Sequence, residues 1–238
     1  MKSRSTRDRL ASIASWSGAV AIVVAGTFSC VSYPIVGARD GSLSAMFAPF
    51  APRATRDSIA TAAAGTYIDR ILADRDSVLD RWPDRADDPI RVWIDSVPGA
   101  ASDQAGFAAA VNEAFDDWAA VGIPVRFRFL SSPQHAEIHV RWIDRLANKT
   151  GSTSWRATRD GWLQNSEITL ATHVSSGRAL DRRGMHAIAL HEIGHALGLS
   201  HSDDDHNIMA PLVRVTNLSS IDCATVRLLY RFQAGRVR

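Results

Sequence analysis

One stretch of the sequence limits what the rest of the chain can be. It runs from His191 to Pro211 and reads HEIGHALGLSHSDDDHNIMAP. On a helix, His191 and His195 lie four residues apart and therefore project from the same face. Two neutral imidazoles at this spacing can hold one Zn²⁺, and Glu192, beside the first histidine, can reach a water on that metal. The stretch therefore predicts a helix that carries a zinc site.

The residues after this helix predict a third metal ligand. Gly198 stands where helices commonly end in the left-handed conformation, which glycine adopts at little cost. The resulting turn would bring His201 back to the metal. Leu190, Ile193 and Leu197 fall on the opposite side of the helix, so core packing would aim the histidines outward into a cleft. Three protein ligands and one open position are typical of a catalytic zinc site, and not of a structural one.

These residues resemble the metzincin metalloproteases, whose motif is H-E-x-x-H-x-x-G-x-x-H followed by a methionine turn. Ser202, and Met209-Ala210-Pro211 beginning eight residues after the third histidine, are similar to the matrixin branch, which includes matrix metalloproteases and bacterial relatives. The resemblance implies that Met209 forms a hydrophobic floor under the zinc. It also implies that Pro211, Leu212 and Val213 line the specificity pocket.

The resemblance further implies an α+β fold, with a twisted five-stranded mixed sheet, one antiparallel edge strand, an active-site helix and a C-terminal helix. The sequence pattern agrees with that order of elements. Strands are expected at residues 90–94, 125–130, 136–142, 151–155 and 167–171. Helices are expected at residues 103–121, from near Arg183, and at residues 218–232. We assign residues 150–156 to the antiparallel edge strand.

The N-terminus has the layout of a targeting segment. Lys2, Arg4, Arg7 and Arg9 precede residues 10–38, which carry no charge and contain an apolar core at residues 13–28. This favours a secretory signal peptide cleaved after Ala38. An uncleaved membrane anchor through residues 10–33 and lipid attachment at Cys30 are the alternatives. All three place the zinc motif outside the cytoplasm, so we expect an exported protein that is secreted, periplasmic or membrane-anchored.

Three regions follow from this reading: residues 1–38 as signal peptide or anchor, residues 39–85 as linker and short helix, and residues 86–238 as the matrixin-like domain. Residues 39–65 have a linker composition, and residues 66–81 predict a short amphipathic helix. The middle region is either a propeptide or a strap on the catalytic domain. Matrixin propeptides cap the zinc with a cysteine, and residues 39–88 contain none. Latency of that kind is not expected.

Other ions and partners receive little support from the sequence. A net charge of +2 gives no reason to expect nucleic acid, and we expect a monomer that binds one catalytic zinc. Matrixins often hold a structural zinc and calcium, but the spacing of the other histidines and the short acidic run at residues 203–205 do not support these ions. Cys223 is expected to be a small buried residue. The side chains considered for a structural zinc are His135, His139 and His173, with Asp144 or Asp160.

The expected reaction is hydrolysis of a peptide bond in a protein or peptide by a metal-activated water, with Glu192 as general base. The aliphatic pocket predicts cleavage before Leu, Ile, Met or Phe, and Arg214 is the nearby charge that could alter this preference. A zinc amidase acting on cell-wall peptides would use the same chemistry. A zinc-stabilised binding module without activity is a third reading, against which the presence of Glu192 argues.

Overall fold

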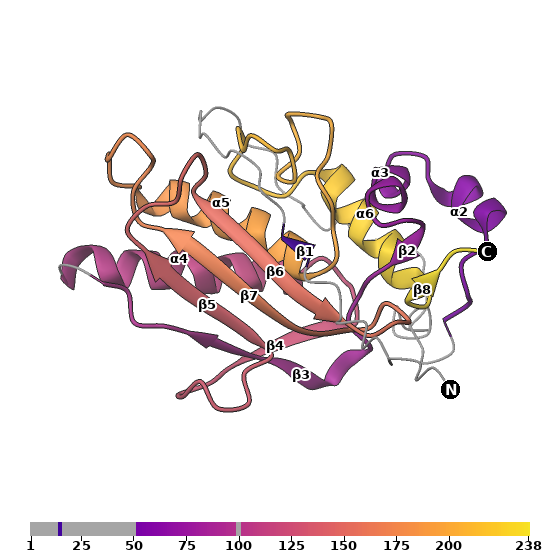
Figure 1. Cartoon of the computed structure of the whole chain (residues 1–238), viewed down its shortest axis with the longest axis horizontal. Helices are drawn as coiled ribbons and strands as arrows, with labels where there is room; N and C mark the ends of the chain where they lie inside the picture. Colours follow the sequence, from indigo (N-terminus) through magenta and orange to yellow (C-terminus); the bar gives the residue numbers. More distant parts are fainter. Residues whose placement is uncertain (1–13, 16–50, 99–100) are drawn as a thin grey trace, which may run out of the picture.

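The computed structural model describes residues 14–15, 51–98 and 101–238. Its central sheet contains β3 (Arg85–Ile94), β4 (Val125–Phe129), β5 (Ile138–Ile143), β6 (Gly151–Ala157) and β7 (Leu163–Ala171) (Figure 1). These strands have the order β6-β7-β5-β3-β4. Only the β6–β7 pair among them is antiparallel. The expected α+β fold, with a five-stranded mixed sheet and an antiparallel strand at one side, is therefore confirmed.

A two-residue strand, β1 (Ala14–Ser15), extends the sheet beyond β6. It runs antiparallel to β6 and pairs Ala14 with Trp155 and Ser15 with Ser154. These two residues belong to the expected targeting segment, and the rest of that segment lies outside the described residues. The outer edge of β6 therefore accepts an antiparallel strand in this structure.

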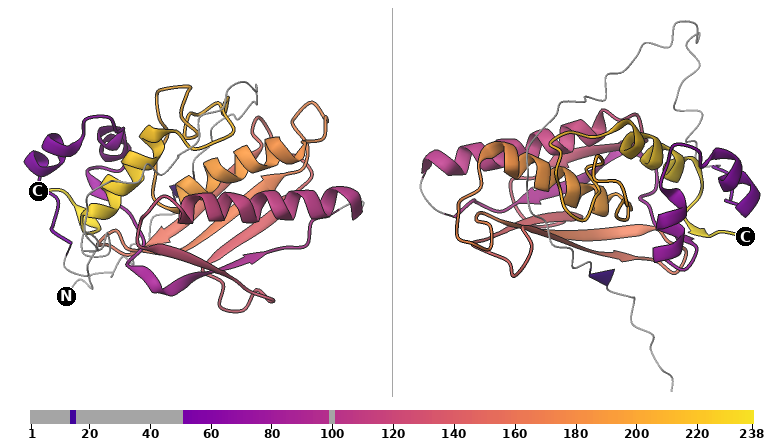
Figure 2. Two further views of the ribbon diagram at one scale, coloured as in Figure 1. Left: turned by 180° about the vertical axis from the view of Figure 1, so that it is seen from behind. Right: turned by 90° about the horizontal axis from the view of Figure 1, so that it is seen from above.

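Two long helices cover one face of the sheet (Figure 2). They are α4 (Ala101–Ala119) and α5 (Arg182–Ala196). The indole Nε1 of Trp118 on α4 donates to the backbone oxygen of Leu190 on α5 at 2.9 Å. Asp181 begins α5 because its carboxylate accepts from the backbone nitrogen of Gly184 at 2.6 Å, which satisfies one of the first amides of the helix. The apolar face of α5 is thereby fixed against the sheet and α4.

The C-terminal helix α6 (Ser220–Arg231) lies beside a folded N-terminal segment, residues 51–82, which we name the strap. The strap contains α2 (Arg56–Ala62), α3 (Ile68–Asp74) and β2 (Val78–Leu79), and β2 pairs antiparallel with β8 (Gly235–Arg236). A linker was expected over residues 39–65. Residues 56–62 instead form α2, because Thr55 and Ser58 make a capping box and Ile59 is buried.

The helix expected over residues 66–81 is shorter than its apolar pattern predicted. It ends at Asp74, and Asp76 and Ser77 then adopt positive φ angles of 50° and 59°. Such angles lie outside the right-handed helical region, so the chain turns. Val78 and Leu79 continue as a strand because β8 offers backbone partners, which no local pattern could indicate.

Cys223, on α6, was expected to be a small buried residue. It is buried and disulfide-bonded. The other cysteine of the sequence, Cys30, lies outside the described residues. Two cysteines so far apart along the chain give no sequence signal for pairing, because the tertiary fold decides which thiols approach each other.

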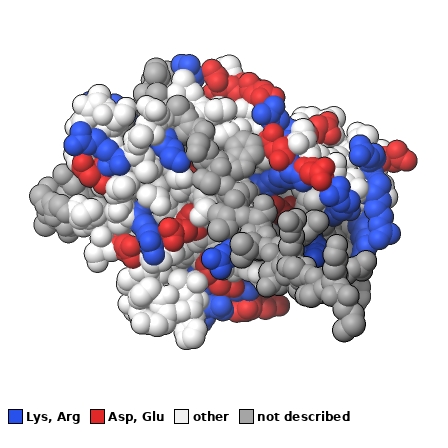
Figure 3. All heavy atoms as spheres, viewed as in Figure 1, with Lys and Arg blue, Asp and Glu red and all other residues white. Residues whose placement is uncertain are grey.

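Acidic and basic side chains are interspersed over the face of the molecule shown in Figure 3. This agrees with the small net charge of +2. Within the described ranges, no helix combines the length and the apolar character that crossing a membrane requires.

Candidate functional site

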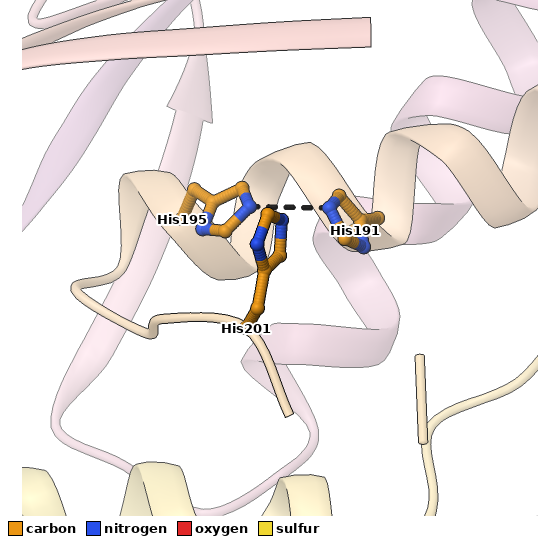
Figure 4. Close-up of side chains that lie close together, drawn as sticks. All are labelled: His191, His195 and His201. Atoms are coloured by element: carbon orange, nitrogen blue, oxygen red, sulfur yellow. Dashed lines mark hydrogen bonds between the residues drawn. The ribbon is translucent and has the colours of Figure 1, made fainter. Parts of the chain in front are cut away.

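Three histidines converge at the C-terminal half of α5 (Figure 4). His191 and His195 project from one face of the helix, and His201 reaches them from the loop that follows. One ring nitrogen of each lies within 4.8 Å of the others. The Nε2 atoms of His191 and His195 are 3.1 Å apart. Among the residues that the structure describes, no other group of three or more histidine, cysteine, aspartate or glutamate side chains is close enough to share a metal ion.

The outer nitrogens of the two helical histidines fix their protonation. Nδ1 of His191 lies 2.8 Å from the backbone oxygen of Ile208, and Nδ1 of His195 lies 2.9 Å from that of Leu199. A carbonyl only accepts hydrogen bonds, so each Nδ1 carries the proton in the neutral ring. The two Nε2 lone pairs therefore lie 3.1 Å apart, an arrangement that favours one cation bound by both nitrogens.

This arrangement fits a zinc ion. Two imidazole nitrogens at the usual Zn–N distance in a tetrahedral site are about 3.3 Å apart, close to the spacing observed here. Burial lowers the pKa of His191 to about 3 and that of His201 to about 4. Burial also lowers the pKa of His195 well below its usual value. All three rings are therefore neutral at pH 7 and offer lone pairs to a metal.

Glu192 lies beside the histidines and is buried. Its Oε2 accepts a hydrogen bond from the hydroxyl of Thr153 on β6 at 2.7 Å. Burial raises the pKa of Glu192 to about 7, against the opposing effects of the Thr153 hydrogen bond and the Lys149 charge. A side chain at Gly151 would overlap the Glu192 carboxyl group, so this glycine leaves room for the carboxylate. The sequence analysis predicted a role in the site for Glu192 but not for Thr153 or Gly151.

The predicted methionine turn packs under the same helix. Met209 is fully buried, and a side chain at Gly194 would overlap its sulfur. The backbone nitrogen of Ser202 donates to the oxygen of Met209 at 2.8 Å, which closes the loop between them. The carbonyl that holds Nδ1 of His191 belongs to Ile208, next to Met209. A hydrogen bond to the backbone oxygen of Ile208 therefore connects His191 to the methionine turn.

Asp222, on α6, supports this turn and was missed in the sequence. It is buried and accepts from the backbone nitrogens of Ile208 at 2.8 Å and Ser219 at 2.9 Å. It also accepts from the hydroxyl of Tyr67 at 3.1 Å. Burial raises the pKa of Asp222. The S-x-x-D capping box at the start of α6 was the available signal for this residue, but it does not indicate the contact with the methionine turn.

The residues expected to form the specificity pocket have different exposures. Val213 is fully buried, Leu212 is half-buried and Pro211 is exposed. Nε of Arg214 lies 3.0 Å from a carboxylate oxygen of Asp205, in the acidic run before the turn. The one charge that could alter the pocket is therefore held by a partner on a neighbouring loop.

The histidines considered for a structural zinc have separate surroundings. His139 contacts Asp95 at 2.8 Å, whereas His173 contacts Asp144 at 2.9 Å. The backbone at His135 has a φ of 66°, and its oxygen accepts from Arg91 at 2.8 Å.

Comparison with known proteins agrees with this geometry. The family model described as Matrixin matches residues 90–231, which include the whole histidine cluster. The chain belongs to the matrixin family. The matched region begins after the strap.

Two curated relatives are distant. Metalloendoproteinase 1 of Glycine max is 28% identical over 145 residues, covering 52% of this chain and 45% of the relative. Matrix metalloproteinase-C of Caenorhabditis elegans is 27% identical over 158 residues, covering 53% of this chain and 25% of the relative. The chain thus spans less than half the length of either relative. Both relatives carry the names of metalloproteinases, in agreement with the family match.

Proposed function

We propose that this chain is a zinc-dependent endopeptidase in which His191, His195 and His201 hold the metal and Glu192 is the general base. The observation that carries the proposal is the convergence of three neutral imidazoles beside one buried carboxylate. A purely structural zinc site would need a fourth protein ligand and would have no use for that carboxylate.

Zinc, when bound, supplies a Lewis acid that polarises the scissile carbonyl and makes a water more acidic. Glu192 accepts the proton of the attacking water and delivers it to the leaving amine. A carboxyl group with a pKa near 7 can perform both transfers at neutral pH. Thr153 holds Oε2, which leaves the other carboxylate oxygen to exchange the proton.

An extended peptide substrate is proposed to pair with the outer edge of β6. The pairing of β1 with Ser154 and Trp155 supports this, because it demonstrates strand addition at that edge. Main-chain hydrogen bonds would then supply most of the binding, with little demand on the substrate sequence. Because β1 occupies the same edge, Ala14 and Ser15 would have to leave it when a substrate binds.

The residues around Met209 are proposed to form the apolar part of the substrate site. Met209 is the hydrophobic floor beneath the metal ligands, and Pro211, Leu212 and Val213 line the pocket for the residue after the scissile bond. The burial of Val213 and the aliphatic character of its neighbours support a preference for an apolar side chain.

The test separates metal binding from catalysis. Glu192→Gln should keep zinc and fold but lose about 10²–10⁴-fold in kcat, because it removes the general base. His201→Ala should lose zinc affinity. A chelator should abolish cleavage of an unbiased peptide library, and zinc should restore it. Wild-type rates in Glu192→Gln would contradict the proposal. Cleavage of cell-wall peptides without cleavage of the library would identify an amidase instead.

We also propose export of a monomeric protein whose catalytic domain, residues 86–238, lies outside the cytoplasm. The proposal rests on the basic and uncharged layout of residues 1–38. Mass spectrometry of the protein from its host should show either a new N-terminus at Arg39 or an intact chain in the membrane fraction. An intact chain in the cytoplasm would contradict it.

A further inference from the structure

We propose that the strap, residues 51–82, is a permanent part of the catalytic unit and that Arg75 is a positioning residue for the turn between His195 and His201. This inference rests on the proposed zinc site, because it assigns a support to two of its ligands. For residues 51–82, it favours the interpretation as a strap over that as a propeptide.

The strap is attached to the catalytic domain over its whole length. Ile68, Ile71 and Leu79 are fully buried in the common hydrophobic core. Tyr67 donates its hydroxyl to Asp222 on α6, and β2 pairs with β8. Removing the strap would expose the core surface that these apolar side chains cover. A removable propeptide would be expected to share less of the core.

The strap also satisfies the C-terminal end of α5, where backbone oxygens have no partner within the helix. The indole Nε1 of Trp82 donates to the oxygen of Ala196 at 2.8 Å. The hydroxyl of Tyr230 donates to the oxygen of Leu197 at 3.1 Å, and the backbone nitrogen of Trp82 lies 3.4 Å from that hydroxyl. The helix that carries two of the metal ligands therefore ends against the strap.

The next residue, Gly198, fits directly against the strap. Its φ is +105°, a conformation that other residues rarely adopt. A side chain here would overlap the backbone oxygen of Asp80. The glycine is thus needed both for the turn and for the close approach of the strap to it.

Arg75 connects the strap to a metal ligand. Its Nη2 donates to the oxygen of Leu199 at 3.2 Å, and the same oxygen accepts from Nδ1 of His195 at 2.9 Å. Nη1 of Arg75 pairs with Asp80 at 3.0 Å, and the guanidinium lies 4.6 Å from the ring centroid of Trp155 on β6. The Arg75 side chain is 6% exposed, so these contacts hold it in one place.

The shared carbonyl gives Arg75 its effect on the site. A carbonyl oxygen has two lone pairs, so Leu199 can accept from Arg75 and His195 together. Arg75 then fixes the direction of this carbonyl, and the carbonyl fixes the ring of His195. Leu199 also lies in the turn that leads to His201. Without Arg75, the orientation of one ligand and the path to another would be less well determined.

The experiment measures zinc affinity by competition with a chelator, using the full-length chain. Arg75→Met keeps the length of the side chain but removes its donors, and it should weaken zinc binding by about 10–100-fold, as outer partners of ligands commonly do. Arg75→Lys should recover part of the loss, because one ammonium can reach Leu199 or Asp80. Arg56→Met, at an exposed position of the same strap, is the matched control and should bind zinc as the wild type does.

Asp80→Asn provides a second variant should Arg75→Met fail to fold. It keeps the backbone oxygen against Gly198 and removes only the charge that holds the guanidinium, so a smaller loss in the same direction is expected. The visible spectrum of the cobalt-substituted protein should change in the variants that lose affinity. Unchanged zinc affinity and cobalt spectrum in folded Arg75→Met, or in Asp80→Asn when Arg75→Met does not fold, would overturn the positioning role.

The N-terminus of the active protein tests the permanence of the strap. Mass spectrometry of the purified, peptide-cleaving species should find an N-terminus at or before Ala51. An active species that begins after Trp82 would overturn this part of the inference. Zinc affinity is measured without any substrate, so this measurement tests the role of Arg75 independently of catalysis. A wild-type chain that binds zinc but cleaves no peptide would contradict the proposed function alone.

Discussion

The hydroxyl of Thr153, on β6, donates a 2.7 Å hydrogen bond to Oε2 of Glu192, on α5. The contact joins the strand proposed to bind substrate to the proposed general base. It stabilises the carboxylate over the carboxylic acid and so opposes the effect of burial on the pKa of Glu192. It also helps to fix the rotamer of Glu192.

Thr153→Val should therefore raise the pKa of Glu192 further. A smaller fraction of the base is then ionised at pH 7, so kcat/KM at that pH should fall and the acidic limb of its pH profile should move to higher pH. A loss of roughly tenfold to a hundredfold is expected, because a hydrogen bond to a charged group contributes about 1.5–3 kcal/mol. Thr153→Ser keeps the hydroxyl and should restore most of the activity. An unchanged profile in Thr153→Val would show that the hydrogen bond does not act on the base.

Asp222→Ala should destabilise the protein by about 3–5 kcal/mol, because it removes the acceptor of two buried donors, on Tyr67 and Ile208, and of the part-buried amide of Ser219. Tyr67→Phe removes one of these donors and should cost about 1 kcal/mol. Urea unfolding measures both. Zinc affinity should also fall in Asp222→Ala. The backbone nitrogen of Ile208 donates to Asp222, and the backbone oxygen of Ile208 accepts from His191. Equal stabilities of the two variants would contradict the assigned role of Asp222.

The metal-free protein should lose stability as the pH falls from about 6.5 to 4.5. The three ligand histidines have lowered pKa values when folded, so the unfolded chain binds up to three more protons at these positions in this range. Glu192 has the opposite effect, because its folded pKa is raised to about 7 and the folded chain therefore binds about one more proton at Glu192 than the unfolded chain. The stability that Glu192 contributes is lost as the pH rises. The net difference is roughly two protons, which favours unfolding in acid.

Urea unfolding of the chelated protein at several pH values checks this linkage. His201→Gln removes one of the three histidines and should flatten the dependence by about one proton. His206→Gln is the matched control, because the His206 side chain is 91% exposed. The assignment fails if His206→Gln flattens the dependence as much as His201→Gln does.

Substrate profiling should find cleavage before Leu, Ile, Met or Phe. Arg214 is held by Asp205, so Arg214→Ala should leave this preference unchanged. Asp205→Ala releases the guanidinium, and only this variant should gain some tolerance for Asp or Glu after the scissile bond. A wild-type preference for an acidic residue there would mean that Arg214 turns into the pocket, and the aliphatic assignment would be wrong.

The sequence by itself determined the histidine cluster and the order of elements from β3 to α6. Both depend on local spacing: the four-residue separation of His191 and His195 places them on one helical face, and Gly198 supplies the turn toward His201. The antiparallel position of β6 and the closing helix were likewise predicted. These features could be read because periodicity and turn chemistry act over a few residues.

The tertiary structure decided which distant residues support that cluster. Thr153, Asp222 and Arg75 contact the site through hydrogen bonds to residues 39, 14 and 124 positions away, respectively. Thr153 and Arg75 occur in ordinary strand and helix patterns that carry no mark of these contacts, and the capping box that contains Asp222 does not reveal its bond to Ile208. The length of α3 also depends on a remote partner, because Val78 and Leu79 pair with β8 as a strand. Local sequence determines the face of a helix or strand on which a side chain lies. Burial and strand pairing across the fold determine which residues that side chain contacts.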